Sequence, residues 1–279
     1  MLRAVTPIGA HVSVAGGLAR ALPRALAVGA EALQVFVANS RAWAHPVDDP
    51  AGDEEFRASC ALPVFVHAPY LINFGSPSPD TLERSTRALA FSLRRGAAIG
   101  ARGVVVHAGS AVLGNPWAGA MRQVREHLLP VLDLEHGPQL LIEPTAGGGG
   151  ALASDAPSLA AYLDVLGRDE RIGVCLDTCH LHAAGHDLST REGFAATLRM
   201  FGRAAGRARI GLVHVNDSRD LVGSKRDRHA SIGAGTIGRD AFAALFSTAA
   251  TRGVPLVVET AEAEHAADIT TLKALRGQA

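Results

Sequence analysis

Short apolar runs rich in Val, Ile and Leu recur eight times along this chain, and they constrain its fold more than any other feature. They lie at residues 5–10, 31–37, 64–68, 103–108, 139–143, 172–177, 210–215 and 255–259. Segments with helical patterning, such as residues 81–100 and 191–206, lie between them. Strands that alternate with helices are typical of βαβ units and a parallel sheet. The continuous apolar strands indicate that both faces of this sheet are covered.

Eight such units in 279 residues predict an α/β fold, namely a (β/α)8 TIM barrel. No linker rich in Pro, Gly or Ser divides the units, so we expect residues 1–279 to form a single domain. An open, doubly wound sheet is the alternative, but no GxGxxG motif follows the first strand to favour it. In a barrel of this kind the active site is expected at the C-terminal face of the strands.

The charge balance and the cysteine content limit the classes of protein to which this chain can belong. The chain has 27 basic and 27 acidic residues, so any positive potential for a nucleic acid must be local or supplied by bound metal ions. The odd cysteine count does not predict a disulfide framework, and Cys175 is expected in the barrel core. No signal-peptide pattern or apolar stretch of membrane-spanning length is present. We therefore expect a cytoplasmic protein with no membrane partner.

Ionisable residues end six consecutive predicted strands. In chain order they are His67, His107, Glu143, Asp177, His214 and Glu259, with His180 just beyond the sixth strand. In a parallel barrel all these strand ends meet on one face. A polar group after an apolar run is part-buried, which costs free energy unless it is paired or bound to a metal. One such residue could be a satisfied core histidine, but the whole set favours a metal site.

The ligand types indicate which metal is bound. Imidazole and carboxylate without thiolate suit Zn²⁺, with Mn²⁺ or Fe²⁺ as alternatives. One zinc ion takes three or four protein ligands, so the set is too large for a single ion. A shared carboxylate could bridge two ions about 3.5–4 Å apart. The loop after the seventh strand adds Asp227 and His229, which could form a further site with His180, and basic neighbours that face either phosphates or solvent: Lys225, Arg226 and Arg228.

Longer stretches of the chain resemble the endonuclease IV family of apurinic/apyrimidinic endonucleases. They are GAHVSVAGGL (9–18), QVFVANSRAW (34–43), HAPYLIN (67–73), VVVHAGS (104–110), IEPTAGGG (142–149), GVCLDTCHLHAAGHD (173–187), HVNDS with GSKRDRH (214–229) and VVET (257–260). They cover almost the whole chain in the family's order. The GVCLDTCH and DRH segments are the most specific of them.

The resemblance implies a trinuclear zinc site, with Mn²⁺ as an alternative at one position. His67 and His107 would hold the first zinc, and Glu143 would bridge the first and the second. The remaining ligands are divided between two ions: Asp177, His214 and Glu259 for the second zinc, and His180, Asp227 and His229 for the third.

The resemblance also implies a substrate, which is double-stranded DNA containing abasic sites. Arg41 and Tyr70 match positions that wedge into the duplex, and Asn39 and Arg228 are further candidate DNA contacts. Taken by themselves, Arg41 is an ordinary surface charge and Tyr70 a packed aromatic. A monomer that associates with the nucleoid through DNA is expected.

The implied reaction is hydrolysis of the phosphodiester 5′ to the abasic sugar, which leaves a 3′-hydroxyl and a 5′-deoxyribose phosphate. Removal of 3′-blocking groups is a related expectation. Metal binding can lower the pKa of a water to about 7, which makes hydroxide available at neutral pH. Glu143 would orient this nucleophile, and Glu259 would join it as the second catalytic carboxylate.

Two other classes of function remain as alternatives. A metal-dependent sugar isomerase or epimerase shares the barrel, but it typically transfers protons with a Lys or a Glu. The only lysines here are Lys225 and Lys273, and both lie outside the predicted strands. A non-enzymatic metal- or DNA-binding protein would be expected to have lost ligands, and none is lost.

The chain departs from the family's pattern at four positions that are not metal ligands. Ser40 and Ala42 replace two glutamines in the NQRQW stretch, and Pro144 replaces an asparagine after Glu143. Ala230 stands where the family commonly has a second histidine. These changes are expected to bear on DNA affinity more than on the cutting chemistry.

Overall fold

A closed barrel of parallel strands forms the centre of the molecule, which we describe from a computed structural model. The structure describes residues 5–112, 114–206 and 209–278. The barrel closes in the order β1-β10-β7-β6-β5-β4-β3-β2, which confirms the predicted TIM-barrel fold. Its strands are β1 (Ile8–His11), β2 (Leu33–Phe36), β3 (Val64–His67), β4 (Gly103–His107), β5 (Gln139–Glu143), β6 (Ile172–Asp177), β7 (Ile210–His214) and β10 (Leu256–Val258).

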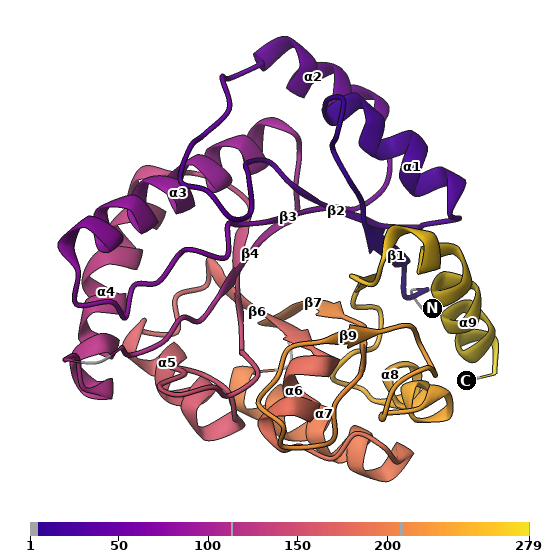
Figure 1. Ribbon diagram of the computed structural model, residues 1–279. Helices are drawn as coiled ribbons and strands as arrows, with labels where there is room; N and C mark the ends of the chain where they lie inside the picture. The colour runs from indigo at the N-terminus through magenta and orange to yellow at the C-terminus, as the bar shows by residue number, and fades with distance from the viewer. Residues whose placement is uncertain (1–4, 113, 207–208, 279) are drawn as a thin grey trace.

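Helices surround this ring of strands on its outer side (Figure 1). Apolar side chains of the strands and helices pack together between the two layers and form the main hydrophobic core. None of the helices in the described ranges combines the length and the apolar character needed to cross a membrane. The α-helices are α1 (Ala21–Ala27), α2 (Pro50–Ser59), α3 (Pro79–Ala98), α4 (Trp117–Leu134), α5 (Ala156–Val165), α6 (Thr178–Ala184), α7 (Arg191–Ala205), α8 (Ala244–Ser247) and α9 (His265–Gly277).

Local sequence signals explain where the helices begin and end. α3 begins two residues before its predicted start because the Ser78 side chain caps it by accepting from the Thr81 amide, and Pro79 occupies the first turn. It ends at Ala98 rather than residue 100, since Gly100 adopts a φ of 74° that a helix cannot include. α5 has a capping box between Asp155 and Ser158.

The inside of the barrel is filled by a second, smaller apolar cluster. Side chains alternate between the two faces of a strand, so residues two apart on a strand share the inner face. The cluster takes one residue from each of six consecutive barrel strands: Phe65, Val105, Leu141, Cys175, Leu212 and Val257. Two residues further along these strands lie the six predicted strand-end ligands. The pleat therefore directs all six toward the barrel axis, one layer above the apolar cluster.

Room for this cluster depends on glycines next to Leu141, among them Gly103 and Gly173. A Cβ on Gly103 would lie 2.7 Å from a Leu141 methyl carbon, and one on Gly173 would lie 2.8 Å from the other. Both distances are shorter than van der Waals contact, so a larger residue at either position would displace Leu141. The floor beneath the candidate site is thus fixed by close packing.

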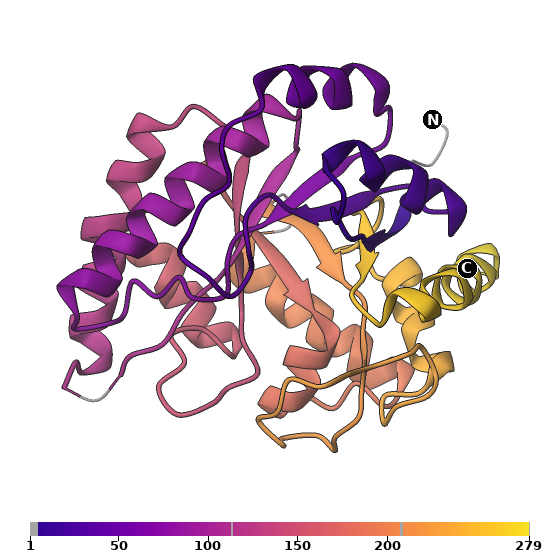
Figure 2. The same cartoon turned by 45° about the horizontal axis from the view of Figure 1, so that its top comes forward.

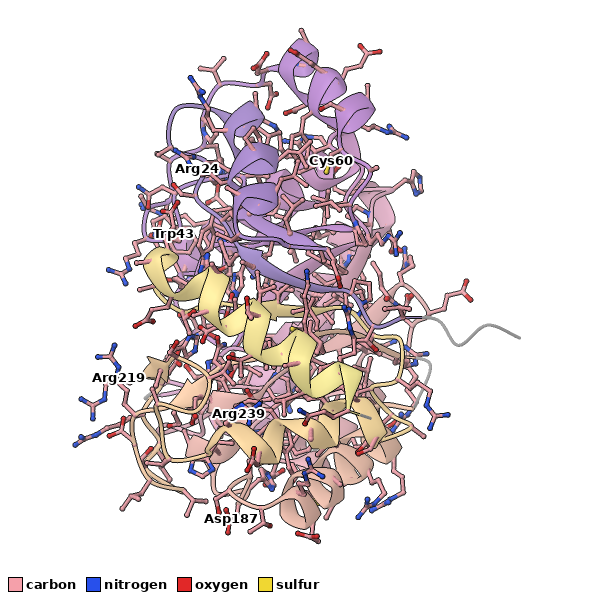
Figure 3. All side chains as sticks on the ribbon, turned by 90° about the vertical axis from the view of Figure 1, so that its right-hand side faces the viewer. Arg24, Trp43, Cys60, Asp187, Arg219 and Arg239 are labelled. Atoms are coloured by element: carbon pink, nitrogen blue, oxygen red, sulfur yellow. The ribbon has the colours of Figure 1, made fainter. Side chains whose placement is uncertain are left out.

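The loops that follow the strands gather on one face of the barrel. In Figure 3, Arg24 and Trp43, which follow β1 and β2, and Arg219, which follows β7, lie along the same edge of the molecule. One of these loops contains a two-stranded antiparallel ribbon, β8 (Asp217–Ser218) and β9 (His229–Ala230), whose connecting loop projects from this face beside α6 and α7 (Figure 1 and Figure 2). This ribbon carries Asp227 and His229.

Candidate metal centre

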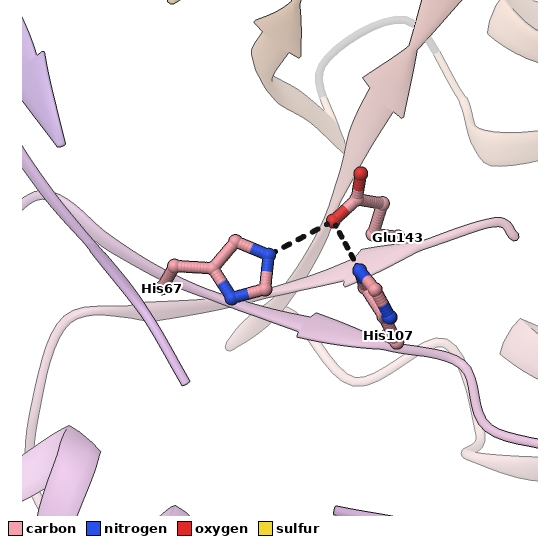
Figure 4. A group of neighbouring side chains, drawn as sticks. All are labelled: His67, His107 and Glu143. Atoms are coloured by element: carbon pink, nitrogen blue, oxygen red, sulfur yellow. Dashed lines mark ion pairs between the residues drawn. The ribbon is translucent and has the colours of Figure 1, made fainter. Parts of the chain in front are cut away.

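Glu143 lies at the centre of the cluster at the barrel mouth. It ends β5, and its carboxylate is fully buried. Oε2 lies 3.4 Å from His67 Nε2 and 3.5 Å from His107 Nε2, as Figure 4 shows. Oε1 lies 3.3 Å from His180 Nδ1 and 3.0 Å from His214 Nδ1. One carboxylate therefore faces imidazoles from both sides, which is the position of a bridging ligand.

Two further groups of ligands adjoin Glu143. In the first, His214 Nδ1 lies 3.3 Å from Glu259 Oε2 and 3.9 Å from Asp177 Oδ2. In the second, the Asp227 carboxylate lies between two imidazoles, 3.1 Å from His180 Nε2 and 2.9 Å from His229 Nε2. The structure thus brings together all nine residues predicted as metal ligands: His67, His107, Glu143, Asp177, His180, His214, Asp227, His229 and Glu259.

Asp177 links the barrel to the helix that follows it. It ends β6 and is also the N-cap of α6, where its Oδ1 accepts from the His180 amide at 2.8 Å. Its Oδ2 accepts from Asn216 Nδ2 at 2.7 Å. Asn216 Oδ1 in turn accepts from the Glu259 amide at 2.8 Å. This chain of hydrogen bonds fixes ligands from three different segments relative to one another.

Backbone carbonyls orient two of the imidazoles. His67 Nδ1–H donates to the Ala68 carbonyl at 2.7 Å. The other ring nitrogen, Nε2, therefore carries the lone pair, and it faces Glu143. His180 Nδ1–H donates to the Pro144 carbonyl at 3.1 Å, which leaves Nε2 facing Asp227. An imidazole that donates one N–H to a fixed acceptor presents its other nitrogen to a metal. Pro144, a departure from the family pattern, therefore takes part in the site through its carbonyl.

The unsatisfied atoms of the cluster show that it fits divalent metal ions. Glu143 Oε2 and His229 Nε2 are buried without a hydrogen-bond partner among the described residues, and such atoms are costly unless a ligand satisfies them. The donor atoms of His67, His107 and Glu143 lie within 4.8 Å of one another, and so do those of His180, Asp227 and His229. Imidazole nitrogens with carboxylate oxygens are the donor set that zinc accepts.

Burial and the charges of neighbouring groups shift the pKa values of these side chains. Burial would raise the pKa of Glu143, but His214, His107 and His180 hold this pKa well below its usual range. Burial lowers the pKa of His107 to about 4. At His180 the nearby carboxylates outweigh burial and raise the pKa well above its usual value. At His214 burial is outweighed by Cys175, Glu259 and Glu143, and the pKa is again well above its usual value. At His229 burial is outweighed chiefly by the contact with Asp227, which brings the pKa to about 9.

A buried carboxylate holds the loop that follows His229. Asp217 accepts from the amides of Gly233 and Ile237, each at 2.9 Å, and from Gly238 at 3.2 Å. This loop begins at the end of β9, directly after the candidate metal ligands Asp227 and His229. Three backbone donors that would otherwise be unpaired are thereby satisfied by one side chain.

Changing Asp217 to Asn is expected to lower the free energy of unfolding by about 1–3 kcal/mol. The amide loses one acceptor oxygen and places donors against backbone N–H groups, which leaves buried donors unpaired. Urea unfolding monitored by circular dichroism measures the change. Asp240→Asn is the matched control, because Asp240 is exposed and its carboxylate pairs with Arg239 on the surface. An Asp217→Asn protein as stable as this control would contradict the assignment.

The predicted wedge residues lie over a cavity at the barrel mouth. Arg41 and Tyr70 line a space of about 470 Å³ together with His107, Asp227 and His229. The Tyr70 amide donates to the Ser40 carbonyl at 3.0 Å, and the Asn39 side chain accepts from the Arg41 amide at 2.9 Å. Asn39 thus shapes the turn that presents Arg41. Ser40, which replaces a glutamine, accepts this hydrogen bond from Tyr70 through its backbone carbonyl. Tyr70 and Arg41 are both exposed to solvent.

The fourth predicted DNA contact is engaged within the protein. Arg228 Nε donates to Asp220 Oδ2 at 2.7 Å, and a second guanidinium nitrogen bonds the other oxygen of this carboxylate. Lys225 lines a second cavity of about 550 Å³ beside His180 and Asp227. Ala230, where the family commonly has histidine, is buried in β9 opposite Asp217.

Sequence reasoning placed some residues incorrectly and missed others. The last barrel strand ends at Val258, so Glu259 follows the strand instead of ending it. Gln34 and Asn216 were not predicted, although a polar residue inside the apolar run 31–37 was a usable signal for Gln34. Cys175 lies in the inner apolar cluster as expected, and burial raises the pKa of its thiol to about 12.

Comparisons with known proteins agree with this geometry. Residues 22–275 match the family described as xylose isomerase-like TIM barrel, which defines the class of protein. Within this class, the chain is 52% identical to "Probable endonuclease 4" of Streptomyces avermitilis, over 97% of this chain and 90% of that protein. Endonuclease IV from Thermus thermophilus has a similar structure, with a TM-score of 0.86 and 34% identity over 98% of this chain and all of that one. The chain belongs to the endonuclease IV family.

A sugar-converting enzyme shares the fold but little of the sequence. The structure of an L-ribulose 3-epimerase has a TM-score of 0.69 over 98% of this chain and 96% of that one, at 20% identity. This likeness establishes a common barrel and nothing about the reaction.

Proposed function

We propose that this protein is a zinc-dependent endonuclease that cuts double-stranded DNA on the 5′ side of abasic sites. The observation that carries the proposal is the single carboxylate, Glu143, that joins three groups of imidazole and carboxylate ligands at the open end of the barrel. Membership of the endonuclease IV family supports DNA as the substrate.

Three zinc ions would be held by the nine clustered side chains, with Glu143 shared between two of them. When bound, these ions supply Lewis-acid stabilisation of charge on the phosphate and a water of lowered pKa. They also supply positive charge to a chain whose formal net charge is zero.

The side chains of this protein would position the reacting groups. Glu143 and Glu259 orient the attacking water toward the phosphorus, on the side opposite the 3′-oxygen. The bond between phosphorus and the 3′-oxygen breaks, this oxygen takes up a proton, and the ends left are a 3′-hydroxyl and a 5′-deoxyribose phosphate. Arg41 and Tyr70 would enter the duplex at the lesion, which offsets the few kcal/mol that unstacking a base step costs.

The same centre would remove 3′-blocking groups, because these are also phosphate esters of the terminal 3′-oxygen. The cavity beside Lys225 has room for such a group next to His180 and Asp227. Arg228 would reach DNA phosphates by exchanging its ion pair with Asp220 for one with the backbone. We further propose that residues 1–279 act as one domain, as a monomer, in the cytoplasm and in association with the nucleoid.

The test is incubation of the purified protein with a duplex that holds one abasic-site analogue, before and after treatment with a strong zinc chelator. A single cut 5′ to the lesion that chelation removes is the expected result. A protein with its full metal content that leaves this duplex intact would overturn the proposal. Screening of small sugars for isomerisation or epimerisation would then test the alternative enzyme class.

Zinc binding is expected to release protons near neutral pH. The raised pKa values of His180, His214 and His229 favour the doubly protonated imidazolium form in the metal-free protein at pH 7. Zinc must displace these protons, so its affinity rises with pH until the folded-state pKa values are passed and falls as the pH is lowered. Calorimetric titration in buffers of different ionisation enthalpy counts the protons released. Proton release near zero at pH 7 would contradict the charge states described here.

A further inference from the structure

Gln34 is a buried polar residue in contact with the centre, and it is not one of the nine predicted metal ligands. It lies on β2 inside the barrel, and it is completely buried. An uncharged amide buried without partners costs free energy, so its hydrogen bonds indicate why it is there. The side-chain hydrogen bonds of Gln34 go to titratable side chains, namely those of His11, Glu259 and His214.

The amide of Gln34 joins three such side chains. Its Nε2 lies 2.7 Å from Glu259 Oε1 and 2.9 Å from His11 Nδ1. Its Oε1 lies 2.9 Å from His214 Nε2. One carboxamide thus spans two predicted ligands of the same ion, Glu259 and His214.

The orientation of this amide follows from its partners. A carboxylate only accepts hydrogen bonds, so the NH₂ group of Gln34 must face Glu259. The carbonyl oxygen then faces His214 Nε2, and an oxygen can only accept. Nε2 of His214 therefore keeps its proton. Nδ1, which lies 3.0 Å from Glu143 and 3.3 Å from Glu259, is the nitrogen that gives up its proton and offers a lone pair when a metal binds.

We propose that Gln34 is a positioning residue that sets the tautomer of His214 and the orientation of Glu259 for metal binding. It acts on both ligands at once, because the two hydrogen bonds fix opposite ends of the same rigid amide. Hydrogen bonds to ligands from such outer residues typically change metal affinity about 10- to 100-fold. The inference rests on the metal centre proposed above.

Two substitutions test separately the hydrogen bond to His214 and the hydrogen bond to Glu259. Gln34→Leu removes all three hydrogen bonds of the amide, to Glu259, His11 and His214, while keeping a side chain of similar size. Gln34→Glu keeps an acceptor for His214 Nε2–H but places a carboxylate against Glu259. Val35→Ala is the matched control, since Val35 is the next residue on β2, is completely buried, and points to the opposite face of the strand.

Zinc affinity, measured by competition with a chromophoric chelator, is expected to fall at least about tenfold in both Gln34 variants and to stay unchanged in Val35→Ala. In zinc-loaded protein labelled with ¹⁵N-histidine, the His214 Nε2–H resonance should be retained in Gln34→Glu and shifted or lost in Gln34→Leu. A merely structural role would not produce this difference between the variants.

Failure of this inference can be distinguished from failure of the metal centre. If the unaltered protein binds no zinc, the proposed function fails and this role for Gln34 fails with it. If the unaltered protein binds zinc and cuts the abasic duplex, but Gln34→Leu binds zinc within twofold of it with an unchanged His214 resonance, Gln34 has no positioning role and the proposed function stands.

Discussion

Changing Glu143 to Gln is expected to lower the rate of cutting at an abasic site by at least about 10²–10³-fold, the size of loss that follows removal of one charge-stabilising group. The amide keeps the shape of the side chain but removes its negative charge. Glu143 faces four imidazoles. The amide NH₂ would point a donor at the nitrogens of His67 and His107 or at Nδ1 of His214, which must offer lone pairs to a metal. The shared ligand of the cluster would be lost.

The measurement is single-turnover cleavage of a duplex with one abasic-site analogue, with the zinc content of each protein determined in parallel. Glu262→Gln makes the same chemical change at an exposed position in the segment after β10, and it should cut at the unaltered rate. Unaltered cutting by Glu143→Gln with a full zinc content would show that the carboxylate has no role in orienting the nucleophile.

Removal of the metal is expected to lower the thermal unfolding midpoint by roughly 10 °C or more. A ligand that binds only the folded state stabilises it by about 4 kcal/mol at a thousandfold excess over its Kd. For a domain of this size each kcal/mol corresponds to about 2–4 °C. Without metal, the buried atoms Glu143 Oε2 and His229 Nε2 also have no hydrogen-bond partner in the part of the chain that the structure describes.

Differential scanning fluorimetry with and without a strong chelator measures this shift, and added zinc should reverse it. His67→Ala with His107→Ala is the informative comparison, because a protein lacking these ligands should respond less to the chelator. A midpoint that does not move in protein shown to have lost its zinc would mean that the cluster is stable when empty.

The fold could be predicted from local pattern because each signal acts over a few residues. The eight apolar runs match the barrel strands to within about three residues at either end, and caps such as Ser78 fix helix starts. The alternation of inward-facing and outward-facing side chains along a strand is also a local property of the sequence. It places His67 two residues after Phe65 and Glu143 two residues after Leu141, on the inner face in both cases.

The candidate ligands were predictable for the same reason. A polar residue at the end of a buried strand stands out in a sequence, and parallel strands bring such ends to one face. Resemblance to the endonuclease IV family added Asp227 and His229, which lie on a ribbon that the strand pattern does not indicate. The sequence alone thus determined the barrel, its functional face and the identity of the groups on it.

Tertiary structure alone decided how these groups are paired and oriented. Gln34 lies 180 residues from His214 and 225 from Glu259, and Asn216 lies 39 residues from Asp177, yet hydrogen bonds join each pair. Such contacts depend on barrel closure and strand register, and a shift of one residue would turn every inward side chain outward. Which nitrogen of an imidazole offers its lone pair is set by acceptors that only the closed barrel brings within reach.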